Sequence, residues 1–530
     1  MRTESRGIQR IVASVARLPS LMAVTIITGL ANCGPGRADE PAAPRADEDR
    51  FLVAVRAFAD AMIEHGRDRY GSVHSPMYAA DLDLETRQLP ERRPPAPPGA
   101  DDYGTQRYSF GGSNLMWDIL TLRAQYLLSE VTGQASYARA ADDYLRFFVD
   151  HCPSSTTGLF PWGQHAFWKL RTEDDPRRLD DQRWRWYGEA GGGGAHEFES
   201  FTPPWREMRK FGPETILEFA QGVFDWHIKC EKTFFFNRHG VLYDRRNPDQ
   251  RPPFPPPIGT RDMAWERHAG LYMYTFAFAY QQTGEARYLE WARGLSDLYW
   301  NVRDPETDKT WPSIWMDADG GLIPDPRHTT RNVLSQQPYW KLKAYRLAPE
   351  AEQARVLRDR ALAYLRAYCR TIDAATGQRT WNSANAQGVE GQMIALAYKV
   401  SGETDFRDWL TAWSRAAFRH RPHACESGRW QLMPGNYANV LVGLIQSHLI
   451  TGDPVFLDQA ADLADESLAL FQHESGLMCA AVTLQAEDGR LRVEPYGYYN
   501  NHTGVQKLVY ALLQLHILRN GLEHPVEHMY

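Results

Sequence analysis

The sequence predicts an all-α protein in which helical hairpins close into an (α/α) toroid. A first observation is a pattern that occurs four times, in which Thr or Ser precedes Gly and an aromatic residue follows four positions after the Gly. A second is that an apolar helix ends at each Gly, which relieves strain at a helix C-terminus. A third is that each following segment is amphipathic, with apolar residues at three- and four-residue spacing. The four copies begin at Thr132, Thr283, Ser401 and Thr451.

Further helices are predicted near residues 351–370, 386–401 and 503–519, and they follow the same scheme. Antiparallel helix pairs of this kind stack in a ring or a solenoid. Six or seven hairpins fit into residues 51–530, which we interpret as one catalytic domain. Seven pairs, with buried inner helices and polar outer ones, are the favoured architecture.

The N-terminal segment has the features of an export signal. Four Arg precede an apolar run over residues 18–31, which is too short for a comfortable transmembrane helix. Residues 30–34 (LANCG) resemble a bacterial lipobox, which would place a lipid anchor on Cys33. We therefore expect residues 1–32 to be removed, residues 33–50 to form a Pro/Ala/charged tether, and the protein to be a periplasmic or cell-envelope lipoprotein.

Charge and cysteine usage exclude several classes of function. The formal net charge is −7, and removal of residues 1–32 takes away four Arg and one Glu and leaves −10, so nothing indicates nucleic-acid binding. The six Cys show no CxxC spacing, which excludes zinc ribbons and redox motifs, although an exported protein could form one or two disulfides. The aromatic content of 12% suits stacking on sugar rings, but a large helical core would also use it.

Arg267 and His268 stand side by side at the mouth of an apolar helix that ends at Gly284. A helix that is apolar all round lies inside a protein, and an unpaired buried charge costs several kcal/mol or more. The pair must therefore face a partner, a ligand or a metal. A salt bridge from the Arg to a neighbouring carboxylate is the simpler alternative.

Two loops carry similar chemistry. Residues 158–168 (GLFPWGQHAFW) place His165 among aromatic residues, and His196 and Glu197 follow four glycines. Two His and a carboxylate from separate loops suit an N/O metal site, but no diagnostic spacing exists. His165 could equally bond a backbone carbonyl, and Glu197 could mark a helix start, where the dipole favours acidic residues. The glycines lack the Lys-Ser/Thr of a phosphate loop, which argues against nucleotide binding.

Several blocks of the sequence resemble the metal-dependent pectate lyases of polysaccharide lyase family 2. The resemblance covers most of residues 51–310 and is weaker in the C-terminal third. It implies an (α/α)7 barrel that cleaves homogalacturonan by β-elimination with manganese or a similar divalent ion. The matching blocks are Gly112-Ser113-Asn114, residues 132–142, residues 158–165, His196-Glu197, residues 236–240 (FNRHG), Arg267-His268 and residues 288–305.

The resemblance also implies roles for individual residues. His165, Glu197 and His268 would hold the metal ion, and Arg267 would be the Brønsted base. A guanidinium almost never loses its proton, so Arg267 would either be neutralised by burial and the nearby ion or act as a charge clamp. In the second case another group abstracts the proton, for which the stand-ins are Glu266 and Tyr108.

The substrate is expected to be an acidic polysaccharide. Insertions at residues 180–194 and 251–258 lie beside the expected cleft, so a uronate polymer other than pectate stays open. Because the protein and such a substrate are both negative, binding must come from local groups. We predict Lys169, Arg171, Arg206 and Trp162 as substrate-binding residues.

Two other functions fit parts of the sequence. An (α/α)6 glycoside hydrolase would need two carboxylates, about 6.5–9.5 Å apart for inversion. A non-catalytic glycan-binding lipoprotein would keep the aromatic cleft without a working site. Residues 381–385 and 498–502, at the starts of apolar helices, we interpret as helix caps. The carboxylates available to a hydrolase are Asp262, Glu266, Glu199 and Glu390.

Overall fold

The computed structural model describes the greater part of residues 49–523. The ranges 72, 93, 95–109, 154–156, 161–166, 171–194, 197–200, 241–263, 318, 326–334, 375–380, 382–389, 423–428 and 488–489 fall outside that description. The predicted export signal, Cys33 and almost all of the predicted tether precede residue 49 and also lie outside it. The division into signal, tether and single catalytic domain therefore stays a prediction.

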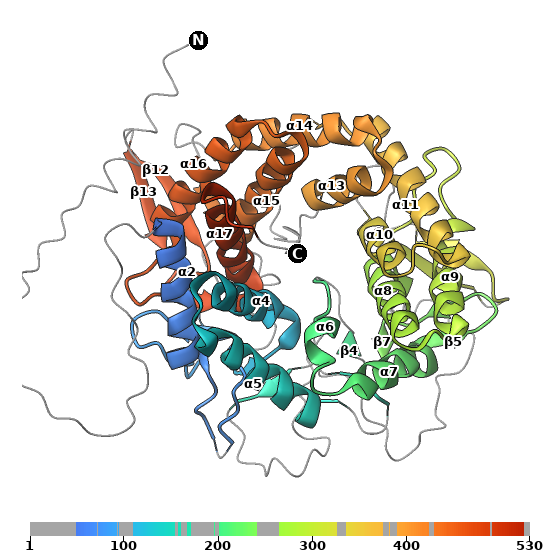
Figure 1. Cartoon of the computed structure of the whole chain (residues 1–530), viewed down its shortest axis with the longest axis horizontal. Helices are drawn as coiled ribbons and strands as arrows, with labels where there is room; N and C mark the ends of the chain where they lie inside the picture. The colour runs from blue at the N-terminus through green and yellow to red at the C-terminus, as the bar shows by residue number, and fades with distance from the viewer. Residues whose placement is uncertain are drawn as a thin grey trace, which may run out of the picture.

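The described helices form two concentric layers of a ring (Figure 1). The inner layer contains α4 (Leu115–Thr132), α8 (Glu266–Thr283), α10 (Gln337–Leu347), α13 (Glu390–Ser401), α15 (Pro434–Thr451) and α17 (Val505–Arg519). The outer layer contains α2 (Arg50–Ala61), α5 (Ala135–His151), α9 (Ala286–Trp300), α11 (Glu352–Thr371), α14 (Thr404–Arg419) and α16 (Pro454–Phe471).

Each inner helix packs on an outer partner, and neighbouring pairs pack on one another. The pairs are α4 with α5, α8 with α9, α10 with α11, α13 with α14, α15 with α16, and α17 with α2. A short pair, α6 (Trp205–Met208) and α7 (Pro213–Gly222), lies between α5 and α8 and completes the ring. The described residues thus contain seven pairs, and the predicted (α/α) toroid is confirmed.

Burial separates the two layers as expected. From Glu266 to Ala279, every residue of α8 except Arg267 is buried. In the outer helix α14 only one stripe is buried, which includes Phe406, Trp409 and Trp413. An inner helix contacts protein on all sides, whereas an outer helix has one face in water.

The repeated Thr/Ser-Gly pattern ends four helices in the same way. Gly133, Gly284, Gly402 and Gly452 each have φ between 70° and 73°, the left-handed region that a side chain would strain. The hydroxyl before each Gly donates to the carbonyl four residues back and accepts from the N–H two residues ahead. The aromatic residue of each repeat is buried and fastens the outer helix; these residues are Tyr137, Tyr288, Phe406 and Phe456.

Short antiparallel ladders, which the sequence did not reveal, lie at the N-terminal ends of inner helices. β2 (Gly112–Ser113), β8 (Ala264–Trp265) and β11 (Arg429–Leu432) run almost directly into α4, α8 and α15. Their partners are β3 (Trp168–Lys169), β9 (Ser313–Met316) and β12 (Val482–Glu487), and the outer strands β10 (Leu322–Pro324) and β13 (Arg490–Pro495) extend two of these sheets. The other ladders join β1 (Asp81–Asp83) with β14 (Tyr498–Asn500), β4 (Ala195–His196) with β7 (His239–Gly240), and β5 (Ile228–Cys230) with β6 (Phe235–Phe236).

The C-terminal turn before α17 helps to close the ring. Asn500 caps the short 3-10 helix Asn501–Thr503 by accepting from the His502 N–H at 2.8 Å, so this part of the cap interpretation is confirmed. Asn501, in contrast, reaches across to α4, where its Nδ2 donates to Asp118 at 3.0 Å. Tyr144 donates to the same carboxyl group at 2.8 Å. Residues 382–385 of the other predicted cap lie outside the described part of the chain.

Asp118 should make the stability of the fold depend on pH. Burial raises its pKa from an ordinary 3.8 to about 7, against the lowering effect of its hydrogen bonds. The folded state therefore holds a proton that the unfolded state releases, and stability falls as pH rises from about 4 to about 7, by up to about 1.4 kcal/mol per pH unit. Asp118→Asn cannot ionise, so the melting temperature of wild type minus that of the variant should fall across this range. A difference that stays constant with pH would contradict this assignment.

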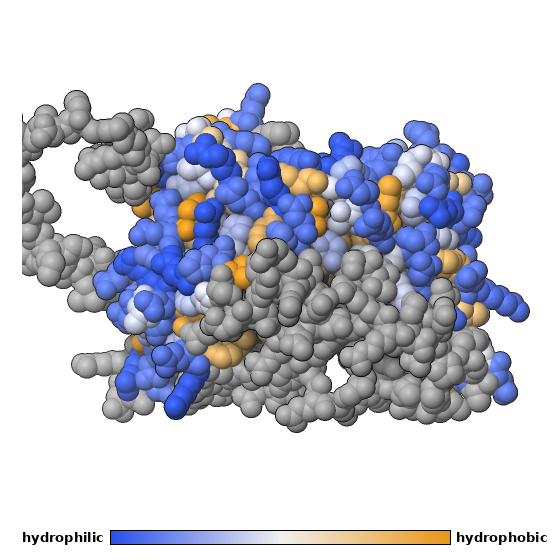
Figure 2. Space-filling view, turned by 90° about the horizontal axis from the view of Figure 1, so that it is seen from below, coloured by the Kyte–Doolittle hydropathy of each residue, from blue (hydrophilic) through white to orange (hydrophobic). Residues whose placement is uncertain are grey.

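The surface visible in Figure 2 is mainly polar, and the described cysteines form no disulfide. On the face in Figure 2 hydrophilic residues predominate and hydrophobic ones are scattered. No disulfide joins the four Cys that the structure describes, which are Cys152, Cys230, Cys369 and Cys479. None of the described helices is both long enough and apolar enough to cross a bilayer.

Candidate functional site

The Arg267-His268 pair lies in the first turn of α8, which begins at Glu266 directly after strand β8. His268 is fully buried and Arg267 is half-buried. The Glu266 N–H donates to the Pro312 carbonyl at 2.9 Å, which ties the helix start to the segment before β9. The pair therefore stands where the partial positive charge of a helix N-terminus adds to that of a guanidinium, an arrangement that favours an anion.

Glu266 links the start of α8 to the start of α10. Its Oε2 accepts from Ser335 Oγ at 2.7 Å and from the Gln337 N–H at 2.8 Å, and its Oε1 accepts from the Gln336 N–H at 3.1 Å. Burial raises the pKa of Glu266, while these bonds and the charge of Arg267 oppose that rise. Glu266 thus caps the N-terminus of α10 from the neighbouring helix. With both oxygens engaged, it is poorly placed as a proton-abstracting base or as a hydrolase carboxylate.

Glu266→Gln should test this structural role. A Gln keeps one acceptor oxygen but its amide nitrogen cannot accept, so at least one donor of α10 loses its partner, at a cost of about 1–3 kcal/mol. We expect a lower melting temperature and a loss of activity below about tenfold, because removal of a general base costs about a hundred- to ten-thousandfold. Glu403→Gln is the control, since Glu403 pairs with Arg366 on the surface. A loss above a hundredfold with unchanged stability would make Glu266 the base.

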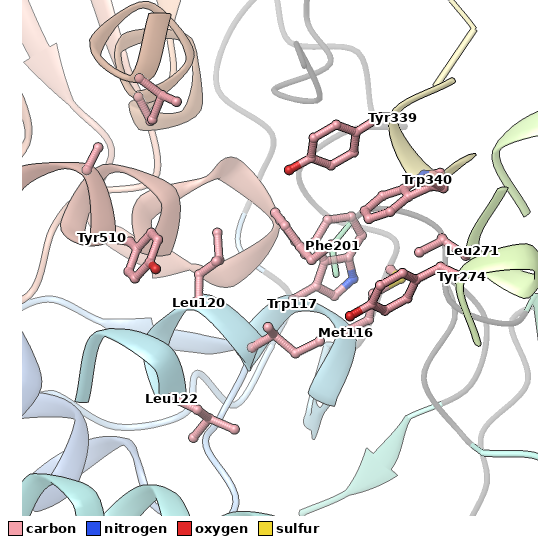
Figure 3. Close-up of a cluster of buried hydrophobic side chains, with 14 of the residues drawn as sticks. Met116, Trp117, Leu120, Leu122, Phe201, Leu271, Tyr274, Tyr339, Trp340 and Tyr510 are labelled. Atoms are coloured by element: carbon pink, nitrogen blue, oxygen red, sulfur yellow. The ribbon is translucent and has the colours of Figure 1, made fainter. Parts of the chain in front are cut away.

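Close packing between α8 and α10 continues one turn further on. A Cβ on Gly270 would lie 2.4 Å from Cδ1 of Trp340, so only glycine lets this indole pack against the helix. Figure 3 shows Trp340 and Tyr339 of α10, Leu271 and Tyr274 of α8 and Trp117 of α4 gathered around Phe201. The start of α8 therefore packs against a cluster of buried aromatic side chains (Figure 3).

Two buried lysines hold the segment that contains Phe201. Lys343 on α10 donates to Thr202 Oγ1 at 2.5 Å, and Lys507 on α17 has its Nζ 5.3 Å from the centre of the Phe201 ring. Burial lowers the pKa of Lys507 to about 7, and Glu390 opposes this shift. These two cations, rather than the exposed Arg206 on α6, lie among the aromatic residues inside the ring. Sequence reasoning missed them because each sits within a buried inner helix and belongs to no recognisable motif.

Two arginine side chains lie over the indole ring of Trp265, the residue before Glu266. The Cζ of Arg267 is 5.5 Å from the centre of its indole ring, and the Cζ of Arg238 is 4.9 Å from the same centre. Arg238 immediately precedes β7, whose partner is β4, with His196 opposite His239. The ladder and the stacked arginines bring the FNRHG and His196 segments to the start of α8.

Most of the other predicted site residues lie outside the part of the chain that the structure describes. His165, Glu197, Arg171 and Trp162 lie outside the described residues, as do Tyr108, Asp262 and Glu199. Lys169 pairs with Gly112 through strand β3. Within the described residues no group of three His, Cys, Asp or Glu could hold a metal ion. Because only His268 of the three predicted ligands is described, the metal site stays a prediction.

Comparison with known proteins supports the family resemblance over part of the chain. Residues 107–311 match the model of a family described as periplasmic pectate lyase. A stretch of 196 residues is 26% identical to a pectate disaccharide-lyase of Dickeya dadantii, which covers 35% of this chain and 34% of that protein. The chain thus spans about a third of the length of this relative. The predicted resemblance is confirmed for these residues, which include positions 165, 197, 267 and 268.

Solved structures with low similarity extend over most of the chain. A GH76 α-mannanase of Bacteroides thetaiotaomicron has a TM-score of 0.43 at 8% identity, covering 90% of this chain and 98% of its own. A D-mannose isomerase has a TM-score of 0.43 at 11% identity, covering 89% and 100%. Neither similarity is close enough to indicate what this protein does.

Proposed function

We propose that this protein is a polysaccharide lyase that cleaves pectate, or a related uronate polymer, by metal-assisted β-elimination at the start of α8. The observation that carries the proposal is the Arg267-His268 pair in the first turn of a buried helix, within the stretch that matches the pectate lyase family. The second guanidinium on Trp265 and the adjacent β4–β7 ladder support it.

The reaction sets three requirements on the site. A proton leaves the carbon next to the uronate carboxylate, the bond to the glycosidic oxygen on the neighbouring carbon breaks, and a double bond forms between the two carbons. Negative charge grows on the carboxylate before the leaving oxygen departs. A lyase therefore needs a base, a cationic environment for the carboxylate, and a site that holds the sugar in one orientation.

Arg267 is the residue that we place at the reacting sugar. Burial raises the pKa of the neighbouring Glu266, and the positive charge of Arg267 opposes that rise. A guanidinium almost never loses its proton, so its positive charge suits the stabilisation of the developing carboxylate charge. The variant Arg267→Lys distinguishes this role from that of a base that takes the proton.

His165, Glu197 and His268 would hold a divalent ion, for which manganese is the first candidate. Imidazole nitrogens and a carboxylate oxygen form a donor set that such ions accept, and the buried position of His268 suits a ligand held in one orientation. When bound, the ion would act as a Lewis acid that neutralises the substrate carboxylate.

We further propose that the protein acts outside the cytoplasm, where polymeric substrates are met. The apolar run at residues 18–31 and the description of the matching family as periplasmic support export. Attachment of lipid at Cys33 would keep the enzyme on the cell envelope. Mass spectrometry of protein released from the envelope tests this point, since lipidation leaves Cys33 as the modified N-terminal residue.

The activity is tested with the purified mature protein and polygalacturonate. Elimination creates a conjugated double bond, so ultraviolet absorbance should rise with manganese present and stop on addition of a chelator. Restoring excess manganese should restore the rise. New reducing ends without ultraviolet absorbance would mean hydrolysis and would overturn the proposal.

A further inference from the structure

Arg238 lies beside the proposed site, and the sequence assigned no role to its side chain. It is half-buried and follows the strand β6, whose residues Phe235 and Phe236 are buried. Its guanidinium lies 4.9 Å from the centre of the Trp265 indole, and that of Arg267 lies 5.5 Å from the same centre. Two guanidinium groups therefore lie against the indole that directly precedes α8.

The backbone that carries Arg238 is held by a buried histidine. The Asn237 N–H donates to the His227 carbonyl at 2.9 Å, and His227 Nδ1 hydrogen-bonds the Asn237 carbonyl at 2.8 Å. His227 is fully buried and lies 3.3 Å from the hydroxyl of Tyr272, one helical turn beyond His268. The backbone next to Arg238 is thus held against the same helix that carries Arg267.

Two fixed arginines suit a ligand with two regularly spaced anionic groups. Each guanidinium can hold a carboxylate through two parallel hydrogen bonds, and stacking on Trp265 reduces the freedom that such binding would otherwise restrict. A uronate polymer supplies one carboxylate on every sugar.

We propose that Arg238 binds the carboxylate of a sugar next to the one that reacts at Arg267, and that it makes the enzyme prefer unesterified uronates. This inference rests on the proposed lyase function. Methyl esterification removes the negative charge of the carboxylate and one oxygen's capacity to bind an arginine fork. A neighbouring esterified sugar therefore binds Arg238 weakly, while chemistry at the Arg267 sugar is unaffected.

The test is Arg238→Gln, assayed by ultraviolet absorbance on polygalacturonate and on pectin with about half of its carboxyl groups esterified. Loss of a charged hydrogen-bond pair should raise KM on polygalacturonate about ten- to a hundredfold, with kcat changed much less. The ratio of kcat/KM between the two substrates should fall toward one. Arg238→Lys keeps the charge and the contact with Trp265 but not the fork, so it should lie between wild type and Gln.

Arg303→Gln is the matched control. Arg303 is also half-buried and stacks on a tryptophan, with its Cζ 4.4 Å from the centre of the Trp300 ring, but it lies three residues past the end of the outer helix α9. This variant should leave KM and the substrate ratio unchanged. If Arg238→Gln and Arg238→Lys lower activity equally on both substrates, or leave both unchanged, Arg238 only supports the fold and the inference is wrong.

Failure of the proposed function would look different. A wild-type protein without ultraviolet product on any uronate polymer would overturn the lyase proposal itself. A wild-type lyase whose preference for unesterified substrate survives in both Arg238 variants would overturn only the role of Arg238. The wild-type trace thus separates the two cases.

Discussion

Arg267→Gln should lower the rate of unsaturated product formation on pectate by about a hundred- to ten-thousandfold, with kcat carrying most of the loss. Gln is polar and fits a half-buried position, but it supplies neither a positive charge nor a base. The growing carboxylate charge would then lack its main protein cation. The measurement is the initial rise of ultraviolet absorbance at saturating polygalacturonate, compared with a circular dichroism melt of the same preparation.

Arg287→Gln is the control for this variant. Arg287 lies on the outer helix α9, with its Cζ 4.8 Å from the centre of the Tyr288 ring, far along the chain from the start of α8. It should change the rate by less than twofold. A rate for Arg267→Gln close to that of Arg287→Gln would remove Arg267 from the site.

Arg267→Lys separates the two roles that Arg267 can have. If Arg267 holds charge, a lysine ammonium replaces part of its effect and the pH profile keeps the wild-type shape. If Arg267 takes the proton, activity should instead increase with pH as the lysine loses its own proton, whose ordinary pKa is about 10.4. Because a guanidinium almost never loses its proton, we expect the wild-type shape.

His268→Ala should remove both bound manganese and activity, with a rate at least about a hundredfold lower. His268 is fully buried at the start of α8, so it cannot act as a surface group that merely happens to lie nearby. The measurements are the manganese content after dialysis and the ultraviolet assay with added manganese. Binding is recorded without substrate, so the metal result does not depend on the activity.

The control for this variant is His448→Ala, a half-buried histidine near the end of α15 whose Nδ1 lies 3.0 Å from the Asp453 carbonyl oxygen. His268→Asn serves as a second variant in case the cavity left by Ala unfolds the protein, since Asn keeps a polar group of similar size. Full manganese content in a folded His268 variant would mean that the metal site, if present, lies elsewhere.

The sequence predicted the ring well because its signals are local. The Thr/Ser-Gly pattern states where a helix ends, and the hydroxyl bonds of Thr132 and Thr283 show why Thr precedes the Gly. The same locality explains what was missed. The β4–β7 ladder joins residues more than forty positions apart, and the sequence of neither strand predicts its partner.

The site shows the same division. The adjacency of Arg267 and His268 is a sequence fact, and their place in a buried helix follows from hydrophobic periodicity. Glu266 was a stand-in base for the case in which Arg267 keeps its proton, yet its oxygens accept hydrogen bonds at the start of α10, about seventy residues along the chain. A role for Arg238 could be inferred only from its contact with Trp265, which brings together residues distant in the sequence.

The most direct test of β-elimination by this protein is the mass of the fragments that the mature wild-type protein releases from a defined oligogalacturonate. Elimination adds no water, so each cleavage should give one fragment with an ordinary reducing end and one unsaturated fragment that lacks the elements of water. We expect this pair of products from the wild-type protein and their loss in Arg267→Gln. Two saturated fragments, whose masses together include one added water, would show hydrolysis and contradict the central claim.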